Sequence, residues 1–317
     1  MSVLVETKNL CKYFKTPRGT LHAVDNVSFQ IEEGETLGVV GESGCGKSTL
    51  GRTIIHLHER TSGQIFLEGE DISDVSKTRI KELRKNMQMI FQDPFSSLNP
   101  RMSVSQLIAE PLLIYKMYRS SSDVMKRVTE LMDTVGIARR LAGSYPHELD
   151  GGRRQRIGVA RALALNPKFI VCDEPVSALD VSIQAQILNL LMDLQEDMGL
   201  TYMFITHDLS VVKHISTEIM VMYMGNCVEK APAKELFENP VHPYTKALLS
   251  AIPIPDISMR TKKIQPIRGE VTSPIDPAPG CRFAPRCDYC KENCVGSSIP
   301  LTEVSEGHFA ACRLLEK

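Results

Sequence analysis

The stretch that decides the fold is TLGVVGESGCGKS, residues 36–48. Its first five residues are apolar and rich in β-formers, which predicts a short buried strand. Residues 41–48 match G-x-x-x-x-G-K-[ST] without a mismatch, and residues 49–57 are predicted to be helical. A strand, a glycine-rich loop and a helix in this order form a phosphate-binding loop, in which backbone N–H groups and the helix N-terminus face an anion. We therefore expect the chain to bind a nucleoside triphosphate.

Side chains of this loop have separate expected roles. Lys47 would reach the outer phosphates, and the Ser48 hydroxyl would ligate Mg²⁺. Cys45 is expected to fill space rather than to act as a nucleophile. The residues of the loop that are expected to contact the nucleotide are Gly41, Ser43, Gly44, Cys45, Gly46, Lys47, Ser48 and Thr49.

A second candidate site follows the apolar run of residues 169–172, which ends in Asp173 and Glu174. The carboxyl ends of parallel strands are where such folds place their ligands. Asp173 is expected to hold Mg²⁺ through water. Glu174 is expected to polarise the attacking water as a general base.

Composition excludes several other classes of protein. The chain has 317 residues, a net charge of −1 and 24% charged residues, so no overall basic field favours nucleic acid. No apolar run is long enough to span a membrane, and the N-terminus lacks the pattern of a secretory signal. Five of the nine cysteines fall within residues 281–312. In a reducing compartment such crowding indicates metal rather than disulfides.

Five further motifs carry a resemblance to a known family. They are KYF (12–14), FQDP (91–94), LDGGRRQR (149–156), SALD (177–180) and ITHD (205–208). Their order and spacing resemble the A-loop, Q-loop, signature, D-loop and switch of the nucleotide-binding subunits of ATP-binding cassette (ABC) transporters. The resemblance covers about residues 1–250.

The resemblance implies a role for each motif. Gln92 would contact Mg²⁺ and the attacking water, and His207 would lie near the γ-phosphate. Phe14 would stack on adenine, with Tyr13 as the alternative. Asp150, Gly151, Gly152 and Asp180 would complete the nucleotide site, and the cofactors would be ATP and Mg²⁺.

Two stretches resemble one branch of this family, the importers of dipeptides, oligopeptides and nickel. They are NPVHPYTKALL (239–249) and PVSALDVSIQAQ (175–186). Within the branch, the chain resembles the second of two paired ATPase subunits. The resemblance implies a second ATPase chain, two transmembrane permeases, an external solute-binding protein and a peripheral position on the cytoplasmic face of the inner membrane. Peptides are the expected cargo, with nickel or another metal chelate as the alternative.

The signature motif departs from the family, because Asp150 stands where Ser is usual and Arg153 where Gln is usual. Each signature is expected to close over the nucleotide that the other subunit holds, so a carboxylate there would repel the γ-phosphate. One interpretation is that the site closed by this signature is slow or idle. The other is that Asp replaces Ser as a helix N-cap with no functional consequence.

The predicted fold is α/β, with a P-loop NTPase core, an antiparallel β subdomain, a helical subdomain and a Cys-rich C-terminal extension. The nucleotide-binding domain would cover residues 1–250, with its helical subdomain at about 95–160. Antiparallel strands are expected within residues 1–35 and about 62–70, and helices at 105–118, 122–135 and 151–165. Residues 251–317 would form a Pro-rich linker and the Cys-rich region. The helical insertion has no sustained heptads, which argues against a soluble cassette ATPase that acts on nucleic acid or ribosomes.

The cysteine spacing resembles the iron–sulfur tail of some members of this branch. The expected ligands are Cys281, Cys287, Cys294 and Cys312, with Cys290 as an alternate. Four thiolates would satisfy a [4Fe–4S] cluster. Structural Zn²⁺ remains the alternative, as do free buried thiols.

Overall fold

The computed structural model describes residues 2–252, 267, 269 and 273–315. This part of the chain divides into two units. The helix-rich unit consists mainly of residues 74–205. The phosphate-loop unit consists mainly of residues 5–31 and 36–73 and of those from 206 onward.

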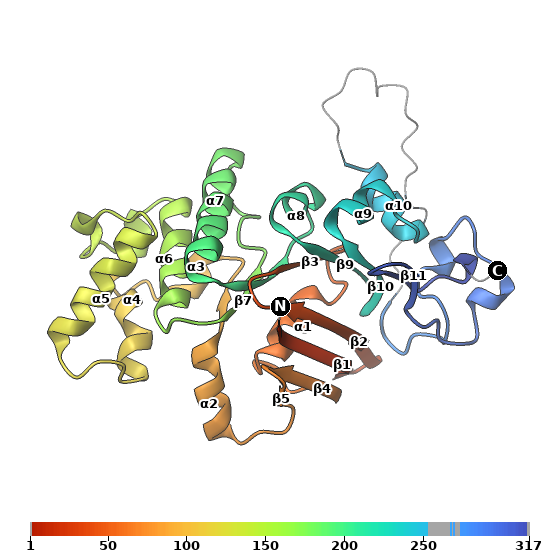
Figure 1. Ribbon diagram of the computed structural model, residues 1–317, viewed down its shortest axis with the longest axis horizontal. Helices are drawn as coiled ribbons and strands as arrows, with labels where there is room; N and C mark the ends of the chain where they lie inside the picture. Colours follow the sequence, from red (N-terminus) through yellow and green to blue (C-terminus); the bar gives the residue numbers. More distant parts are fainter. Residues whose placement is uncertain (1, 253–266, 268, 270–272, 316–317) are drawn as a thin grey trace, which may run out of the picture. The chain divides into compact units, whose positions relative to one another are not determined.

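The first sheet of the phosphate-loop unit has four strands in the order β2-β1-β4-β5 (Figure 1). These are β1 (Val3–Thr16), β2 (Gly19–Glu32), β4 (Ser62–Leu67) and β5 (Glu70–Asp71). β1 pairs antiparallel with β4, with Val5 opposite Leu67. Alternate residues of β2, among them Val27, Phe29 and Ile31, are buried, which is the pattern of an antiparallel sheet with one apolar face. This confirms the antiparallel sheet expected from the sequence.

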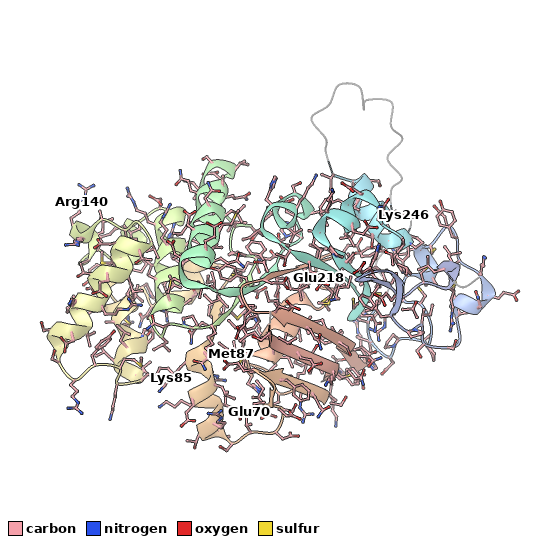
Figure 2. The ribbon with its side chains drawn as sticks, in the orientation of Figure 1. Glu70, Lys85, Met87, Arg140, Glu218 and Lys246 are labelled. Atoms are coloured by element: carbon pink, nitrogen blue, oxygen red, sulfur yellow. The ribbon has the colours of Figure 1, made fainter. Side chains whose placement is uncertain are left out.

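The second set of strands in this unit begins with the strand before the phosphate loop. β3 (Thr36–Val40) pairs parallel with β9 (Glu218–Tyr223), and β9 pairs antiparallel with β10 (Asn226–Pro232). All five residues of β3 are buried, as a parallel strand covered on both faces requires. Glu218, labelled in Figure 2, begins β9 and forms an ion pair with Lys230 at 2.7 Å.

The sheet continues into the C-terminal region, which the sequence did not predict. β12 (His308–Ala310) pairs antiparallel with β10, and β11 (Thr302–Ser305) pairs antiparallel with β12. The buried carboxylate of Glu229 accepts hydrogen bonds from the N–H groups of Val241 and His242, at 2.8 and 3.0 Å. It also lies 2.8 Å from Nε2 of His308. Glu229 therefore connects the C-terminal hairpin to the segment that leads into α10 (Pro243–Ser250).

The helices of the phosphate-loop unit are short. They are α1 (Lys47–Ile54), α8 (Leu209–Ile215), α9 (Ala233–Glu238) and α10 (Pro243–Ser250), with single 3₁₀ turns at Ala284–Arg286, Glu292–Cys294 and Arg313–Leu315. α1 begins two residues before the predicted start, at Lys47, and ends at Ile54. It follows Gly46 directly, so its N-terminus faces the phosphate loop.

The helix-rich unit combines three parallel strands with a group of helices. Its strands lie in the order β8-β7-β6, with β7 paired to both neighbours. They are β6 (Met87–Ile90), β7 (Phe169–Asp173) and β8 (Thr201–Ile205). Its helices are α2 (Lys77–Asn86), α3 (Pro94–Ser97), α4 (Val104–Ile114), α5 (Ser121–Thr134), α6 (Gly151–Leu163) and α7 (Val181–Met198), with 3₁₀ turns at Arg139–Leu141 and Pro146–Glu148.

Helices α4, α5 and α6 correspond to the helices expected at residues 105–118, 122–135 and 151–165, and they pack on one another (Figure 1). Ser103 starts α4 with a reciprocal capping box to Gln106, and Ser120 caps α5 through the N–H of Asp123. α4 ends four residues before the predicted Tyr118. Lys116 takes a left-handed φ of 50° there, and a helix cannot continue through that conformation.

None of the helices within the described ranges combines the length and apolar character needed to cross a membrane.

Candidate functional site

The phosphate loop is shaped by close backbone packing behind it. Gly46 has a φ of +107°, and a Cβ there would lie 1.9 Å from the carbonyl oxygen of Ala23. Gly41 has a φ of +152°, and its Cβ would lie 2.2 Å from the carbonyl oxygen of Met222. No side chain fits at either position, so the pattern G-x-x-x-x-G reflects contact with β2 and β9 as well as access for an anion.

Lys47 lies within the curve of this loop. Its Nζ donates to the carbonyl oxygens of Gly41 and Glu42, at 2.8 and 3.1 Å, and the side chain is buried. The residue also begins α1. The cation and the positive end of a helix thus meet at one point, as binding of a triphosphate requires.

Cys45 lies within the same loop and is buried, with its Sγ 3.8 Å from Nζ of Lys47. Burial raises the pKa of the Cys45 thiol, against the opposing charge of Lys47. A protonated buried thiol is inert, which agrees with the expectation that Cys45 fills space.

The two aromatic candidates for adenine stacking, Tyr13 and Phe14, differ in their contacts. Tyr13 donates from its hydroxyl to Asp25 at 2.6 Å and stacks on His22 at a ring distance of 4.0 Å. Phe14 meets His58 edge-on at 5.7 Å and lies beneath the ammonium of Lys12. Tyr13 is therefore held by a hydrogen bond and a stacked ring, whereas Phe14 has only an edge contact with half-buried His58 and a cation–π contact with Lys12.

Asp25 gathers several of these groups. Besides Tyr13, its carboxylate lies 3.0 Å from Nδ1 of His22 and forms an ion pair with Arg282. Burial raises the pKa of Asp25, but the hydrogen bonds from Tyr13 and His22 and the charge of Arg282 outweigh it and leave the pKa below its usual value. Arg282 of the cysteine-rich region thus pairs with the carboxylate to which Tyr13, the neighbour of Phe14, donates.

The strand-end carboxylates lie in the helix-rich unit. Asp173 ends β7 and is fully buried. Glu174 has a left-handed φ of 47°, and its N–H donates to the carbonyl oxygen of Ile205 at 2.9 Å. Such strain in a residue with a side chain is concentrated at functional sites.

Gln92 meets Glu174, and these are two of the residues singled out in the sequence. Nε2 of Gln92 donates to Oε2 of Glu174 at 2.8 Å. The next residue, Asp93, caps α3 by accepting from the N–H of Phe95 at 2.8 Å. Phe95 itself is exposed and lies under the guanidinium of Arg154.

Asp150 caps helix α6. Its Oδ1 accepts from the N–H of Arg153 at 2.8 Å, and its Oδ2 lies 3.4 Å from the guanidinium of the same residue. These contacts are compatible with both interpretations of Asp150, as a charge that slows the partner's site and as a helix N-cap with no functional consequence. The carboxylate performs the structural work of the usual serine, and it also presents a charge that Arg153 offsets only in part, because both side chains are more than half exposed.

The signature and D-loop residues are in contact within the helix-rich unit. A Cβ on Gly152 would come within 2.7 Å of Ile183, and one on Gly151 within 3.0 Å of Leu179. Asp180 stands at the N-cap position of α7, without a side-chain capping bond. The start of α6 therefore packs directly against the D-loop and α7.

His207 is exposed in the phosphate-loop unit, between β8 and α8. The N–H of the preceding Thr206 donates to the carbonyl oxygen of Val39 at 3.1 Å, and Asp208 caps α8 through the N–H of Ser210. These bonds fix the backbone on both sides of His207 next to the strand that leads into the phosphate loop.

The cysteines were expected to form a metal centre. Cys281, Cys287, Cys294 and Cys312 do line one small cavity, and Cys290 is exposed. However, no three Cys, His, Asp or Glu residues of the described chain are grouped so as to hold a metal ion. Burial raises the pKa of Cys281 to about 11 and also raises that of Cys312. The described residues thus show no metal-binding group at these cysteines.

Comparison with known proteins adds two family matches. Residues 24–177 match the model described as "ABC transporter", and residues 228–294 match "Oligopeptide/dipeptide transporter, C-terminal region".

The curated relatives match over nearly the full length of the chain. The oligopeptide transport ATP-binding protein OppF of Bacillus subtilis is 52% identical over 310 residues, which cover 98% of this chain and 96% of that protein. OppF of Salmonella typhimurium is 51% identical and covers 98% of this chain and 93% of its own.

Solved structures resemble the cassette part. The ATP-binding cassette MJ0796, in a dimeric post-hydrolysis state bound to ADP and Pi, has a TM-score of 0.66 and 30% identity, with 73% of this chain and 99% of that chain covered. CbiO1 of Clostridium perfringens, part of the transporter complex cbiONQ, has a TM-score of 0.67 and 28% identity, with 75% and 92% covered.

Proposed function

We propose, since the chain belongs to the ABC transporter family, that it is the ATP-hydrolysing subunit of a peptide importer. Its α/β fold is that of the ATP-binding cassettes, and ATP and Mg²⁺ are the expected ligands of an ABC ATPase. The observation that carries the proposal is the identity of about half of all residues with OppF-type subunits over 98% of the chain. That similarity includes residues 228–294, which match the C-terminal region of oligopeptide/dipeptide transporters.

ATP binding is assigned to the phosphate-loop unit. Lys47 would bind the outer phosphates, Ser48 would ligate Mg²⁺ and Phe14 would stack on adenine. The buried position of Lys47 and the contacts of Tyr13 within the protein support these roles. His207 would contact the γ-phosphate from the segment that leads into α8.

Hydrolysis is assigned to residues of the helix-rich unit. Asp173 would hold Mg²⁺ through water, and Glu174 would polarise the attacking water. Gln92 would orient the same water, and its hydrogen bond to Glu174 supports a shared task. Mg²⁺ would supply charge stabilisation of the transferred phosphoryl group.

We further propose that the partner is a different ATPase chain. Asp150, Gly151 and Gly152 would close over the partner's nucleotide, with Asp180 beside them, and the charge of Asp150 would slow that site. The site of this chain, closed by a partner with the usual serine, would carry most of the hydrolysis. Two permeases and a solute-binding protein would complete a complex that this chain joins peripherally, at the cytoplasmic face of the inner membrane.

The thiols that line the cavity support a further proposal, that residues 281–312 hold an iron–sulfur cluster, with Zn²⁺ as the alternative. The four thiols would have to move together to bind either metal. Anaerobically purified protein with iron and absorbance near 400 nm would support the cluster. Zinc without colour would support the alternative. If the protein contains neither iron nor zinc, the cysteines are free buried thiols.

Reconstitution into proteoliposomes tests the transport function. The chain, its partner ATPase, the permeases and the binding protein should hydrolyse ATP and accumulate labelled oligopeptide, and Lys47→Ala should abolish both. Accumulation of a nickel chelate in place of peptide would support the alternative cargo. Hydrolysis stimulated by nucleic acid and independent of the permeases would overturn the proposal.

A further inference from the structure

One arginine of the cysteine-rich region reaches the phosphate loop. Arg286 ends the 3₁₀ turn 284–286, and its guanidinium makes two hydrogen bonds to the carboxylate of Glu42, at 2.8 and 3.2 Å. The Arg286 side chain is only 7% exposed. The Glu42 side chain is partly exposed. A bidentate pair between arginine and a carboxylate is directional and stronger than a neutral hydrogen bond.

Glu42 is the second residue of the phosphate loop, and each of its polar groups has a partner within the protein. Its N–H donates to the hydroxyl of Tyr244 at 2.9 Å, and its carbonyl oxygen accepts from Nζ of Lys47 at 3.1 Å. The N–H of Glu42 is therefore committed to Tyr244 rather than to a phosphate. Glu42 joins the loop lysine on one side to residues 244 and 286 on the other.

Aromatic packing fixes the position from which Arg286 reaches the loop. Its guanidinium also donates to the hydroxyl of Tyr223 at 3.3 Å. The rings of Tyr223, Tyr244 and Phe283 contact one another at 4.7 to 5.3 Å, and all three are buried. Buried rings in mutual contact have little conformational freedom. They therefore hold the Arg286 side chain in the position from which it bonds to Glu42.

We propose that Arg286 is a positioning residue for ATP hydrolysis, which sets the place of Lys47 through Glu42. This inference rests on the proposed ATPase function. Removal of the guanidinium leaves the Glu42 carboxylate without its bidentate partner, so the first turn of the loop relaxes and carries the carbonyl oxygens that hold Lys47. Small misplacements of groups that stabilise charge are costly in rate. The cysteine-rich region thus supports the catalytic loop directly.

The test uses the reconstituted complex and the variant Arg286→Gln. We expect kcat for ATP hydrolysis to fall about tenfold or more, with KM for ATP changed by less than about threefold. Arg286→Lys should recover only part of the rate, because an ammonium keeps the charge but cannot make the two parallel hydrogen bonds of a guanidinium. The matched control is Arg139→Gln, which breaks another bidentate pair, with Asp133 at 3.0 and 2.6 Å, in the helix-rich unit.

A double-mutant cycle separates positioning from general destabilisation. Glu42→Gln should lower kcat to the same extent as Arg286→Gln, and the double variant should be no slower than either single variant. Additive losses, or a kcat for Arg286→Gln equal to that of the wild type, would overturn the inference. If the wild-type complex shows no hydrolysis that depends on Lys47, the proposed function fails instead.

The state of the loop can also be measured without turnover. Cys45 is buried in the loop, so its labelling by a thiol reagent, read by mass spectrometry at that residue, reports on loop opening. Arg286→Gln should speed the labelling of Cys45 about tenfold while Arg139→Gln leaves it unchanged. Equal labelling rates in the wild type and Arg286→Gln would contradict the inference whatever the ATPase result.

Discussion

Gln92 and Glu174 are joined by a hydrogen bond of 2.8 Å from the amide Nε2 to the carboxylate Oε2. Glu174 holds a left-handed φ of 47° at this point. The residue proposed to orient the attacking water therefore contacts the residue proposed to act as base. A displacement of Gln92 would lengthen or break this hydrogen bond and so shift the Glu174 carboxylate.

The variant Glu174→Gln should keep ATP binding and lose hydrolysis. An amide keeps the shape and can still bond to Gln92, but it cannot accept the proton of water. General-base catalysis contributes about 10²- to 10⁴-fold, and kcat should fall within that range. Single-turnover hydrolysis and fluorescent-nucleotide binding measure the two effects, and Glu130→Gln on the exposed face of α5 is the control. Normal hydrolysis in Glu174→Gln, with loss only in the partner's equivalent variant, would reverse the proposed assignment of the active site.

Asp150 allows its cap to be separated from its charge. Asp150→Ser keeps the N-cap and removes the carboxylate, so the melting temperature should stay the same while hydrolysis at the partner's site rises. Asp150→Ala removes the cap as well and should cost about 1 kcal/mol of stability. Thermal melts and site-resolved single-turnover assays give both quantities. If Asp150→Ser leaves hydrolysis at both sites unchanged, Asp150 is only a cap.

The two aromatic candidates should differ in their effects on ATP affinity. Phe14→Ala should weaken ATP binding, because stacking of a base on an aromatic ring contributes about 1–3 kcal/mol. Tyr13→Phe keeps the ring and loses the hydrogen bond to Asp25, so it should lower stability by about 1 kcal/mol without changing the affinity. Nucleotide titration and thermal melts distinguish them. A larger affinity loss in Tyr13→Ala than in Phe14→Ala would move the adenine contact to Tyr13.

His242 should make the protein sensitive to mild acid. Burial lowers the pKa of His242 to about 4 from its ordinary 6.5, and its Nδ1 accepts from the N–H of Tyr244 at the start of α10. The unfolded chain thus binds a proton between these values that the folded chain does not. The resulting stability is present above pH 6.5 and is lost as the pH falls towards 4, by about 2 kcal/mol at pH 5.

His242→Asn provides the matched comparison for this pH effect, because asparagine keeps an N-cap acceptor and does not titrate. Thermal melts at pH 7 and pH 5 should show a smaller drop for this variant than for the wild type. His147→Asn, at an exposed site, should behave as the wild type does. An identical drop in all three proteins would rule out His242 as the source.

The sequence predicted the elements whose structure depends on residues that are adjacent in the chain. The phosphate loop and the strand that ends at Asp173 are short strings whose chemistry depends on their immediate neighbours, and the helices of residues 104–163 follow from local periodicity and caps. The sequence did not predict the contacts between distant residues. Arg286 and Glu42 are 244 positions apart and Arg282 and Asp25 are 257 apart, and no local pattern indicates such pairs.

The cysteine-rich region illustrates the same limit. The spacing of its cysteines predicted a metal site. The contacts with Asp25 and Glu42 are instead made by the arginines next to two of these cysteines, Arg282 and Arg286. The only feature of the sequence that pointed to the pair of Glu42 and Arg286 was the charged residue in the phosphate loop. A single charge does not indicate which residue pairs with it.

The pairing of β12 with β10 has a practical consequence for anyone who trims this chain to a minimal cassette. A cut near residue 250 would remove β12 and leave β10 as an open edge strand, with backbone groups ready to pair with another molecule. It would also remove His308 from the carboxylate of Glu229. Such fragments should aggregate, and their poor behaviour would reflect a missing edge cover rather than a defect of the nucleotide site.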